Sequence, residues 1–317
     1  MTIKITKENK KKIFELISAF LEDETETVNK ISQAQKQISV NNYLDAPAPI
    51  ENLPNGLVHK YGTNEDTRIN LVGTWGQFNS FFPIKAALRI LGNILVDQNE
   101  KYIKLDFFIE KCIEVFLKTK IAGKKLGKFR GFPRRRKDSA VGRFVWHFLT
   151  PAFEMGLISI KSENSRINMI PTSPKDWNKV LISLTKEGYE LALLPNNLFD
   201  NLNKDQRLTE EETKWIINYL KKIKNEGFNE YSILHGVYSE LLSTNNIEKV
   251  WSWFENNPIF IEYIKGWTTK QNDEKAFQKQ IDNLSKTFTS SKIALLRELK
   301  IIQDRRGDYS VIGELNA

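Results

Sequence analysis

The side chains that most often carry out chemistry in proteins are few and scattered in this chain of 317 residues. Its three histidines, His59, His147 and His235, are far apart in the sequence. None has a metal-ligating companion three or four residues away, as a metal site on one helix requires. The single cysteine, Cys112, falls on the apolar face of an expected helix, which predicts a buried and unreactive thiol. We therefore expect no catalytic residues, no metal site and no cofactor.

Motifs that bind phosphate or a catalytic metal ion are also missing from the sequence. The run Ala122-Gly123-Lys124-Lys125 lacks the spacing of a phosphate-binding P-loop and the apolar strand that precedes one. Asp106, Glu110 and Lys111 fall on an expected helix, where the acids and lysine of a magnesium-dependent nuclease are hard to assemble. The sequence favours a function other than catalysis, and we keep a nuclease with an unrecognised active site as an alternative.

The strongest chemical signal is a concentration of positive charge between Lys118 and Arg143. This segment holds eleven lysines and arginines and one acid, Asp138, so its net charge is +10 in a chain whose net charge is +8. Its glycines and Pro133 predict a loop. Because so many cations repel one another unless a polyanion binds them, we expect nucleic-acid phosphates here, although an acidic protein or an anionic lipid satisfies the same electrostatics. The residues expected to contact phosphate are Lys124, Lys125, Lys128, Arg130, Arg134, Arg135, Arg136 and Lys137.

A helix is expected directly after the basic loop, beginning near Ser139, a residue type favoured at helix N-caps. Its apolar face consists of Val141, Val145, Phe148, Ala152 and Met155. A second face carries Arg143, His147 and Thr150, which we expect to face a DNA groove. Arginine can bind guanine through two hydrogen bonds, and the threonine methyl group can contact thymine. Pro151 either kinks this helix or starts a new turn after residue 149.

The order of the expected elements resembles a winged helix. Helices are expected from Pro83, over 105–117 and from Ser139, followed by β-like runs at 157–161 and 180–184 and a final helix from Thr185. The stretches Gly156-Leu157-Ile158 and Leu184-Thr185-Lys186-Glu187-Gly188 are similar to the GLI … LTxxG phrasing common in the winged-helix superfamily. This resemblance covers about residues 83–195. It implies that the helix over 139–150 enters the major groove, and that Lys161 and Arg166 of the wing touch the DNA backbone or the minor groove.

The C-terminal part repeats this scheme less clearly. Thr209 and Glu212 form a capping box before a helix, and further helices are expected near 231–243, 246–256, 272–286 and 290–299. Two β-like runs flank Arg306-Gly307-Asp308 and predict a hairpin. We interpret this part as a second winged helix, with a helical bundle that ends in a packing hairpin as the alternative. Its expected contact residues are Ser291, Lys292, Arg297, Arg305 and Arg306.

These elements predict a mainly α-helical fold with small β-hairpin wings and tandem winged-helix units. We expect an N-terminal helical appendage over 1–40, an irregular linker over 41–82, a winged-helix domain over 83–200 and a helical domain over 201–317. Apolar residues make up 40% of the chain and charged residues 27%, which is typical of a soluble globular protein. No apolar run is long enough to span a bilayer, no signal peptide is evident, and the single cysteine suits the reducing cytoplasm.

The combined expectation is a protein that binds double-stranded DNA and no membrane. The basic loop would neutralise phosphates, and the helix after it would read bases in the major groove. Such a protein could serve as a transcription regulator or as the recognition subunit of a restriction or defence assembly. A protein-interaction adaptor built on winged helices is the alternative from another class. The N-terminal helices offer a surface for a homodimer or for a partner protein.

Overall fold

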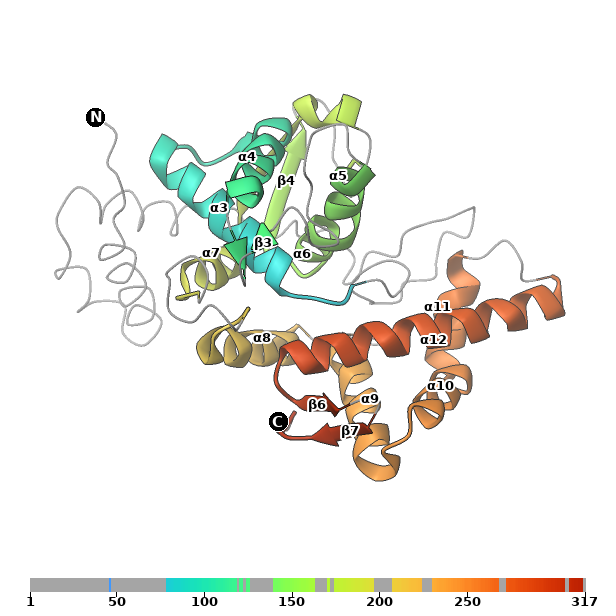
Figure 1. The fold of residues 1–317 in the computed structure, drawn as a ribbon. Helices are drawn as coiled ribbons and strands as arrows, with labels where there is room; N and C mark the ends of the chain where they lie inside the picture. The colour runs from blue at the N-terminus through green and yellow to red at the C-terminus, as the bar shows by residue number, and fades with distance from the viewer. Residues whose placement is uncertain are drawn as a thin grey trace. The chain divides into compact units, whose positions relative to one another are not determined.

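The part of the chain that the computed structural model describes consists of two compact units (Figure 1). The described residues are 46, 78–118, 120–121, 124–125, 139–162, 170–171, 174–196, 207–223, 230–267, 272–305 and 308–315. Among them, the first unit comprises Ala46 and the residues from Phe82 to Glu212, and the second comprises 78–81 and the residues from Thr213 onward. The boundary between the units after Glu212 lies twelve residues beyond the boundary expected at 200–201. The expected appendage over 1–40 lies outside the described residues, as does most of the expected linker over 41–82.

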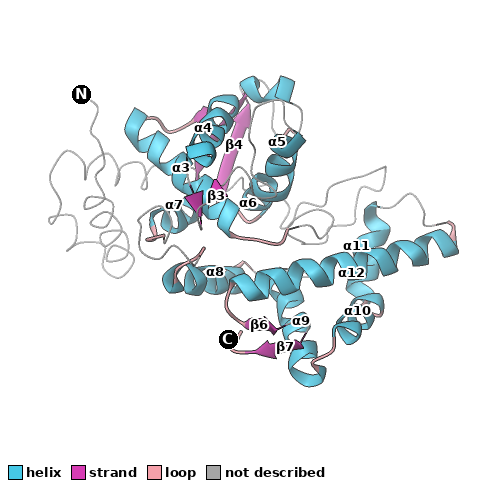
Figure 2. Ribbon diagram, in the orientation of Figure 1, coloured by secondary structure: helices cyan, strands magenta, loops and turns pink. Residues whose placement is uncertain are grey.

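Helices surround a small antiparallel sheet in the first unit. The elements are α3 (Phe82–Gln98), β1 (Ile103–Lys104), α4 (Leu105–Lys118), β2 (Lys120–Ile121), β3 (Lys124–Lys125), α5 (Ser139–Phe144), the π-helical turn η4 (Val145–Leu149), α6 (Thr150–Glu154), β4 (Ile158–Ser162), the 3-10 helix η5 (Pro174–Lys179), β5 (Val180–Leu184) and α7 (Lys186–Leu193). Helix α8 (Glu210–Lys222) begins in this unit, and the division falls within it after Glu212. Figure 2 separates the strands, in magenta, from the helices.

The sheet has the strand order β1-β5-β4, with both pairs antiparallel. Ile103 pairs with Ile182, which in turn pairs with Ile160, and all three side chains are buried. Helices α3 and α4 both contact the central strand β5. Cys112 lies on the apolar face of α4 as expected, and it is buried there together with Phe108, Ile109, Ile113 and Phe116. The sheet and these helices therefore form one hydrophobic core.

The two halves of the GLI … LTxxG phrasing meet in space at the end of α6. Gly156 has a φ of 74°, a left-handed conformation that glycine adopts without steric cost and that ends the helix. Thr185 donates a hydrogen bond to the Gly156 carbonyl oxygen at 2.7 Å, and its hydroxyl also accepts from the Gly188 N–H to cap α7. A Cβ atom at Gly188 would lie 1.9 Å from the Leu157 carbonyl oxygen. The hydrogen bonds of Thr185 thus connect the end of α6 to the start of α7.

The second unit is helical and ends in a hairpin. Its elements after α8 are α9 (Glu230–Thr244), α10 (Ile247–Glu255), α11 (Pro258–Trp267), α12 (Glu274–Glu298), β6 (Ile302–Arg305) and β7 (Asp308–Val311). Phe254, Phe260 and Phe288 pack against one another with ring centroids 5.0 to 5.8 Å apart. The expected hairpin is confirmed, because Arg305 pairs with Asp308 and leaves a two-residue connection. Across the described residues, no helix is both long enough and apolar enough to cross a membrane.

One long helix replaces two of the helices expected in this unit. We predicted separate helices over 272–286 and 290–299, but α12 runs without a break from Glu274 to Glu298. Hydroxyl side chains at the predicted break hydrogen-bond within the helix: Thr287 donates to the Asn283 carbonyl oxygen and Ser290 to that of Lys286. Helix α11 was not predicted, although Pro258 at its start and Asn257, which accepts from the Phe260 N–H, are ordinary start signals.

Candidate nucleic-acid interface

The helix expected to read DNA bases begins at Ser139 as predicted and continues through α5, η4 and α6 to Glu154. Its expected apolar face is buried throughout. On the other face Arg143 is exposed and His147 is half-buried. Thr150 was wrongly predicted to face a groove, because it is only 2% exposed and donates a hydrogen bond to the Val145 carbonyl oxygen at 3.1 Å.

A widened turn before Pro151 explains the burial of Thr150. Proline lacks a backbone N–H, and its ring clashes with a carbonyl of the preceding helical turn. The chain forms the π-helical turn Val145–Leu149 just ahead of it, and the Thr150 N–H donates to Val145, five residues back. The helix therefore neither breaks nor restarts at Pro151. The additional residue in this turn rotates Thr150 out of the line that α-helical spacing predicts from Arg143 and His147.

The start of the basic segment is a short hairpin where we predicted a loop throughout. Lys120 pairs with Lys125 and Ile121 with Lys124, so the two paired strands are antiparallel and only two residues apart in the sequence. Lys124 and Lys125 are thus placed by their backbone in β3. The other expected phosphate contacts lie outside the described residues: Lys128, Arg130, Arg134, Arg135, Arg136 and Lys137.

One cation at the edge of this segment is already engaged by a carboxylate of the same molecule. Lys118, at the end of α4, donates to Glu114 at 2.6 Å, and Lys111 donates to the same carboxylate at 3.0 Å. These hydrogen bonds from Lys118 and Lys111, with their charges, lower the pKa of Glu114 to about 2. Lys118 is therefore excluded from the residues to which we assign phosphate contacts.

Lys161, which we expected to lie in a wing, is exposed on β4, and its Nζ lies 3.9 Å from the ring centroid of Tyr102. The other expected wing contact, Arg166, lies outside the described residues. Among the described residues, no group of three or more histidine, cysteine or acidic side chains could hold a metal ion. Cys112 is buried, and its burial raises the pKa of the thiol well above its ordinary value.

Two of the contact residues expected in the C-terminal part are buried, so their prediction was wrong. Lys292 is fully buried, and its Nζ lies 2.5 Å from Glu230 Oε1 and 5.7 Å from the ring centroids of Phe78 and Phe288. Ser291 is 6% exposed. The charge of Lys292 is satisfied inside the second unit because α12 packs against α9, which carries Glu230. Arg297 is exposed, Arg305 belongs to β6, and Arg306 lies outside the described residues.

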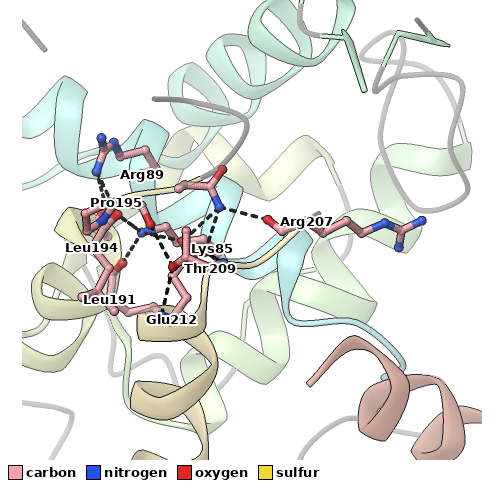
Figure 3. Close-up of polar contacts among 10 residues, drawn as sticks. Lys85, Arg89, Leu191, Leu194, Pro195, Arg207, Thr209 and Glu212 are labelled. Atoms are coloured by element: carbon pink, nitrogen blue, oxygen red, sulfur yellow. Dashed lines mark hydrogen bonds and ion pairs between the residues drawn. The ribbon is translucent and has the colours of Figure 1, made fainter. Parts of the chain in front are cut away.

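Sequence reasoning missed a buried polar network at the C-terminal end of α7 (Figure 3). Lys85 donates to the carbonyl oxygens of Leu191 and Leu194, and Arg89 donates to that of Ala192 at 2.8 Å. The last carbonyls of a helix have no partner within it, so these two cations supply hydrogen-bond donors and favourable charge there. Lys85 and Arg89 are the only polar residues among residues 82–92, the first eleven residues of α3, which are otherwise apolar on all sides. That pattern was the available signal that both would be buried.

Glu212 completes this network and confirms the predicted capping box. The Thr209 hydroxyl accepts from the Glu212 N–H at 3.1 Å, and Glu212 Oε2 accepts from the Thr209 N–H at 2.7 Å. Asn196 also donates to the carboxylate, and Lys85 Nζ lies 3.1 Å from Glu212 Oε1 with both side chains fully buried. The cluster positions the ends of α7 and α8. It is closed to solvent, and we assign it a structural role.

No protein-family model matches the sequence, and no curated protein and no solved structure matches it.

Proposed function

We propose that this protein binds double-stranded DNA through its first unit, which we interpret as a winged helix. The observation that carries the proposal is the position of the cation-rich segment 118–137, which leads directly into the helix with the exposed Arg143. The strand order β1-β5-β4 supports the winged-helix interpretation. Strand β1, which lies between α3 and α4, pairs with β5, the second strand of the hairpin that we interpret as the wing. The second unit keeps the order of helix and hairpin, but Ser291 and Lys292 are buried, so the proposal rests on the first unit alone.

Each part has a separate role in this proposal. The lysines and arginines of the basic segment other than Lys118 contact phosphates and release counterions, which makes affinity strongly dependent on salt and nearly independent of sequence. The hairpin β2–β3 places Lys120 opposite Lys125, and like charges in opposed positions disfavour strand pairing. A bound phosphate would relieve that repulsion. Arg143 would face the major groove and bind a base edge, and Lys161 would contact the backbone.

Fluorescence anisotropy with labelled duplex DNA, single-stranded DNA and RNA at two salt concentrations tests the proposal. We expect binding to the duplex, and a decrease in affinity of an order of magnitude or more when salt rises from low to physiological concentration. A preference for single strands or RNA would contradict base reading in a duplex groove. Absence of binding to every nucleic acid would favour the adaptor alternative, and magnesium-dependent cleavage in the same samples would favour the nuclease alternative.

Arg143 offers a test of base reading. We expect Arg143→Ala to reduce the affinity for a preferred duplex by about 1–3 kcal/mol, and to affect unrelated duplexes much less, because a bidentate contact to guanine is lost. Arg143→Lys is the matched control, since it keeps the charge but loses the planar pair of donors. The preferred duplex is first selected from a random pool with the unmodified protein. Equal losses on all duplexes would mean that Arg143 contacts only phosphate.

The biological use of this binding is a further part of the proposal. A protein with these parts would act as a transcription regulator, or as the recognition subunit of a restriction or defence assembly in which a partner cuts. A reporter under a promoter that contains the selected duplex distinguishes the two. Repression or activation of the reporter supports a regulator, and a silent reporter together with copurification of a nuclease supports the recognition subunit.

A further inference from the structure

A row of three paired residues crosses the three-stranded sheet on one face. Leu181 in the central strand β5 pairs with Lys104 in β1 on one side and with Lys161 in β4 on the other. Residues paired across neighbouring strands lie on the same face, and strands lie about 4.8 Å apart, so the two lysines are separated by about 10 Å. Both lysine side chains are exposed, and Leu181 between them is half-exposed. The register alone therefore places two cations side by side on one face.

Tyr102 lies on the same face and contacts one of these lysines. It is two residues before Lys104, and side chains two residues apart in an extended strand point to the same side. The ring centroid is 3.9 Å from Lys161 Nζ, a distance at which a cation is attracted to the face of an aromatic ring. The chain before β1 is fixed to the sheet, because Ser183 donates a hydrogen bond to the Lys101 carbonyl oxygen. Tyr102 is thus held in place and in turn holds the long side chain of Lys161.

The borders of this row are richer in lysine than in acid. Lys101, Lys175 and Lys179 are exposed on the segments next to β1 and β5, and the exposed acids there are Glu100 and Asp176. Within the described residues, neither Lys104 nor Lys161 forms an ion pair with a carboxylate. This distribution differs from that of the edge of the basic segment, where Glu114 engages Lys118.

We propose that Lys104 and Lys161 form a second phosphate-contact surface on the sheet, and that Tyr102 is a positioning residue for Lys161. This inference rests on the proposed function and extends the DNA-contacting surface from the wing across to β1. A lysine side chain that is already held over a ring loses less conformational entropy on binding than a mobile lysine does. Less of the electrostatic attraction between Lys161 and the phosphate is therefore offset, and the binding affinity is higher. The ligand is the sugar-phosphate backbone of the same duplex.

The test measures how the affinity for a labelled duplex depends on salt. Each phosphate contact contributes about 0.9 to the slope of log K against log salt concentration, so we expect Lys104→Ala/Lys161→Ala to make the slope less negative by about 1.8. Tyr102→Leu should weaken binding several-fold, and Tyr102→Phe, which keeps the ring, should bind as the unmodified protein does. The exposed pair Lys249→Ala/Lys279→Ala in the second unit is the control for the loss of two charges. Melting temperatures verify that each variant is folded.

The outcomes separate this inference from the proposed function. If the unmodified protein binds duplex DNA and the Lys104→Ala/Lys161→Ala slope is unchanged, the sheet surface is overturned and the proposed function stands. If Tyr102→Phe loses as much affinity as Tyr102→Leu, the ring does not position Lys161. If the unmodified protein binds no duplex, both the proposed function and the sheet surface are wrong.

Discussion

Glycine is required at position 188, where α7 packs against the backbone of Leu157. The Cα of Gly188 lies so close to the Leu157 carbonyl that an added Cβ would be 1.9 Å from the oxygen, and the close contact is with backbone, which cannot move aside as a flexible side chain can. Gly142 in α5 is a matched control, because a Cβ there would meet no atom within 4 Å.

We expect Gly188→Ala to destabilise the protein by about 3 kcal/mol or more, since overpacking against a fixed group forces the backbone to shift. Gly142→Ala should stabilise it by up to about 1 kcal/mol, because alanine favours the helix. Urea unfolding monitored by circular dichroism compares the two variants with the unmodified protein. Equal stability of the two variants would show that α7 does not approach the Leu157 carbonyl as closely as described.

The burial of individual side chains could be predicted from the sequence where regular helical spacing applies. The predicted burial of the apolar face from Val141 to Met155 and of the Cys112 side chain is confirmed. Thr150 was mispredicted because a π-helical turn changes the spacing, and sequence periodicity assumes 3.6 residues per turn. Lys292 was mispredicted because its partner Glu230 is 62 residues away in the sequence. A distant ion pair cannot be identified from local pattern.

The ends of α7 and α8 depend on one buried ion pair. Glu212 caps α8, Lys85 caps the last carbonyls of α7, and the two side chains contact each other without access to solvent. Removing one member of a buried pair leaves an uncompensated charge, whereas removing both does not. The coupling between the two residues can therefore be measured by a double-mutant cycle.

We expect Glu212→Gln and Lys85→Met each to cost about 3–5 kcal/mol in the free energy of unfolding, and the double variant to cost clearly less than their sum. Thermal and urea unfolding of the four proteins provide the cycle. The exposed pair Lys286 and Asp282, with nitrogen and oxygen 2.8 Å apart, is the control and should show almost no coupling. Additive losses for Lys85 and Glu212 would mean that the two side chains act independently.

Elements were predicted best where their end signals are local. The capping box of Thr209 and Glu212 is confirmed, as is the hairpin of β6 and β7. The division of α12 into two helices was wrong, because Thr287 and Ser290 are compatible with either a break or a continuous helix. Their hydroxyls bond to carbonyls of the preceding turn, and the choice is made by packing of the helix against α9 and α10.

On the scale of the whole molecule, the distribution of charge is more informative than its total. The net charge is +8, and the segment from Lys118 to Arg143 alone contributes +10, so the rest of the chain is close to neutral with a net charge of −2. A general attraction to polyanions would depend on the total charge, whereas a built interface depends on where the charges are. Two variants that lose the same charge at different places can separate these cases.

Arg134→Ala/Arg135→Ala/Arg136→Ala and Lys249→Ala/Lys275→Ala/Lys279→Ala both change the net charge from +8 to +5. The three lysines are exposed on α10 and α12 in the second unit. If the basic segment contacts phosphates, the arginine variant should bind duplex DNA more weakly and its slope of log K against log salt should become less negative by about 2.7, while the lysine variant keeps the slope of the unmodified protein. Equal changes in the two variants would show that affinity follows net charge alone, and an unchanged slope in the arginine variant would remove these arginines from the interface. Anisotropy titrations of both variants over a series of salt concentrations, with melting temperatures as the control for folding, give the answer.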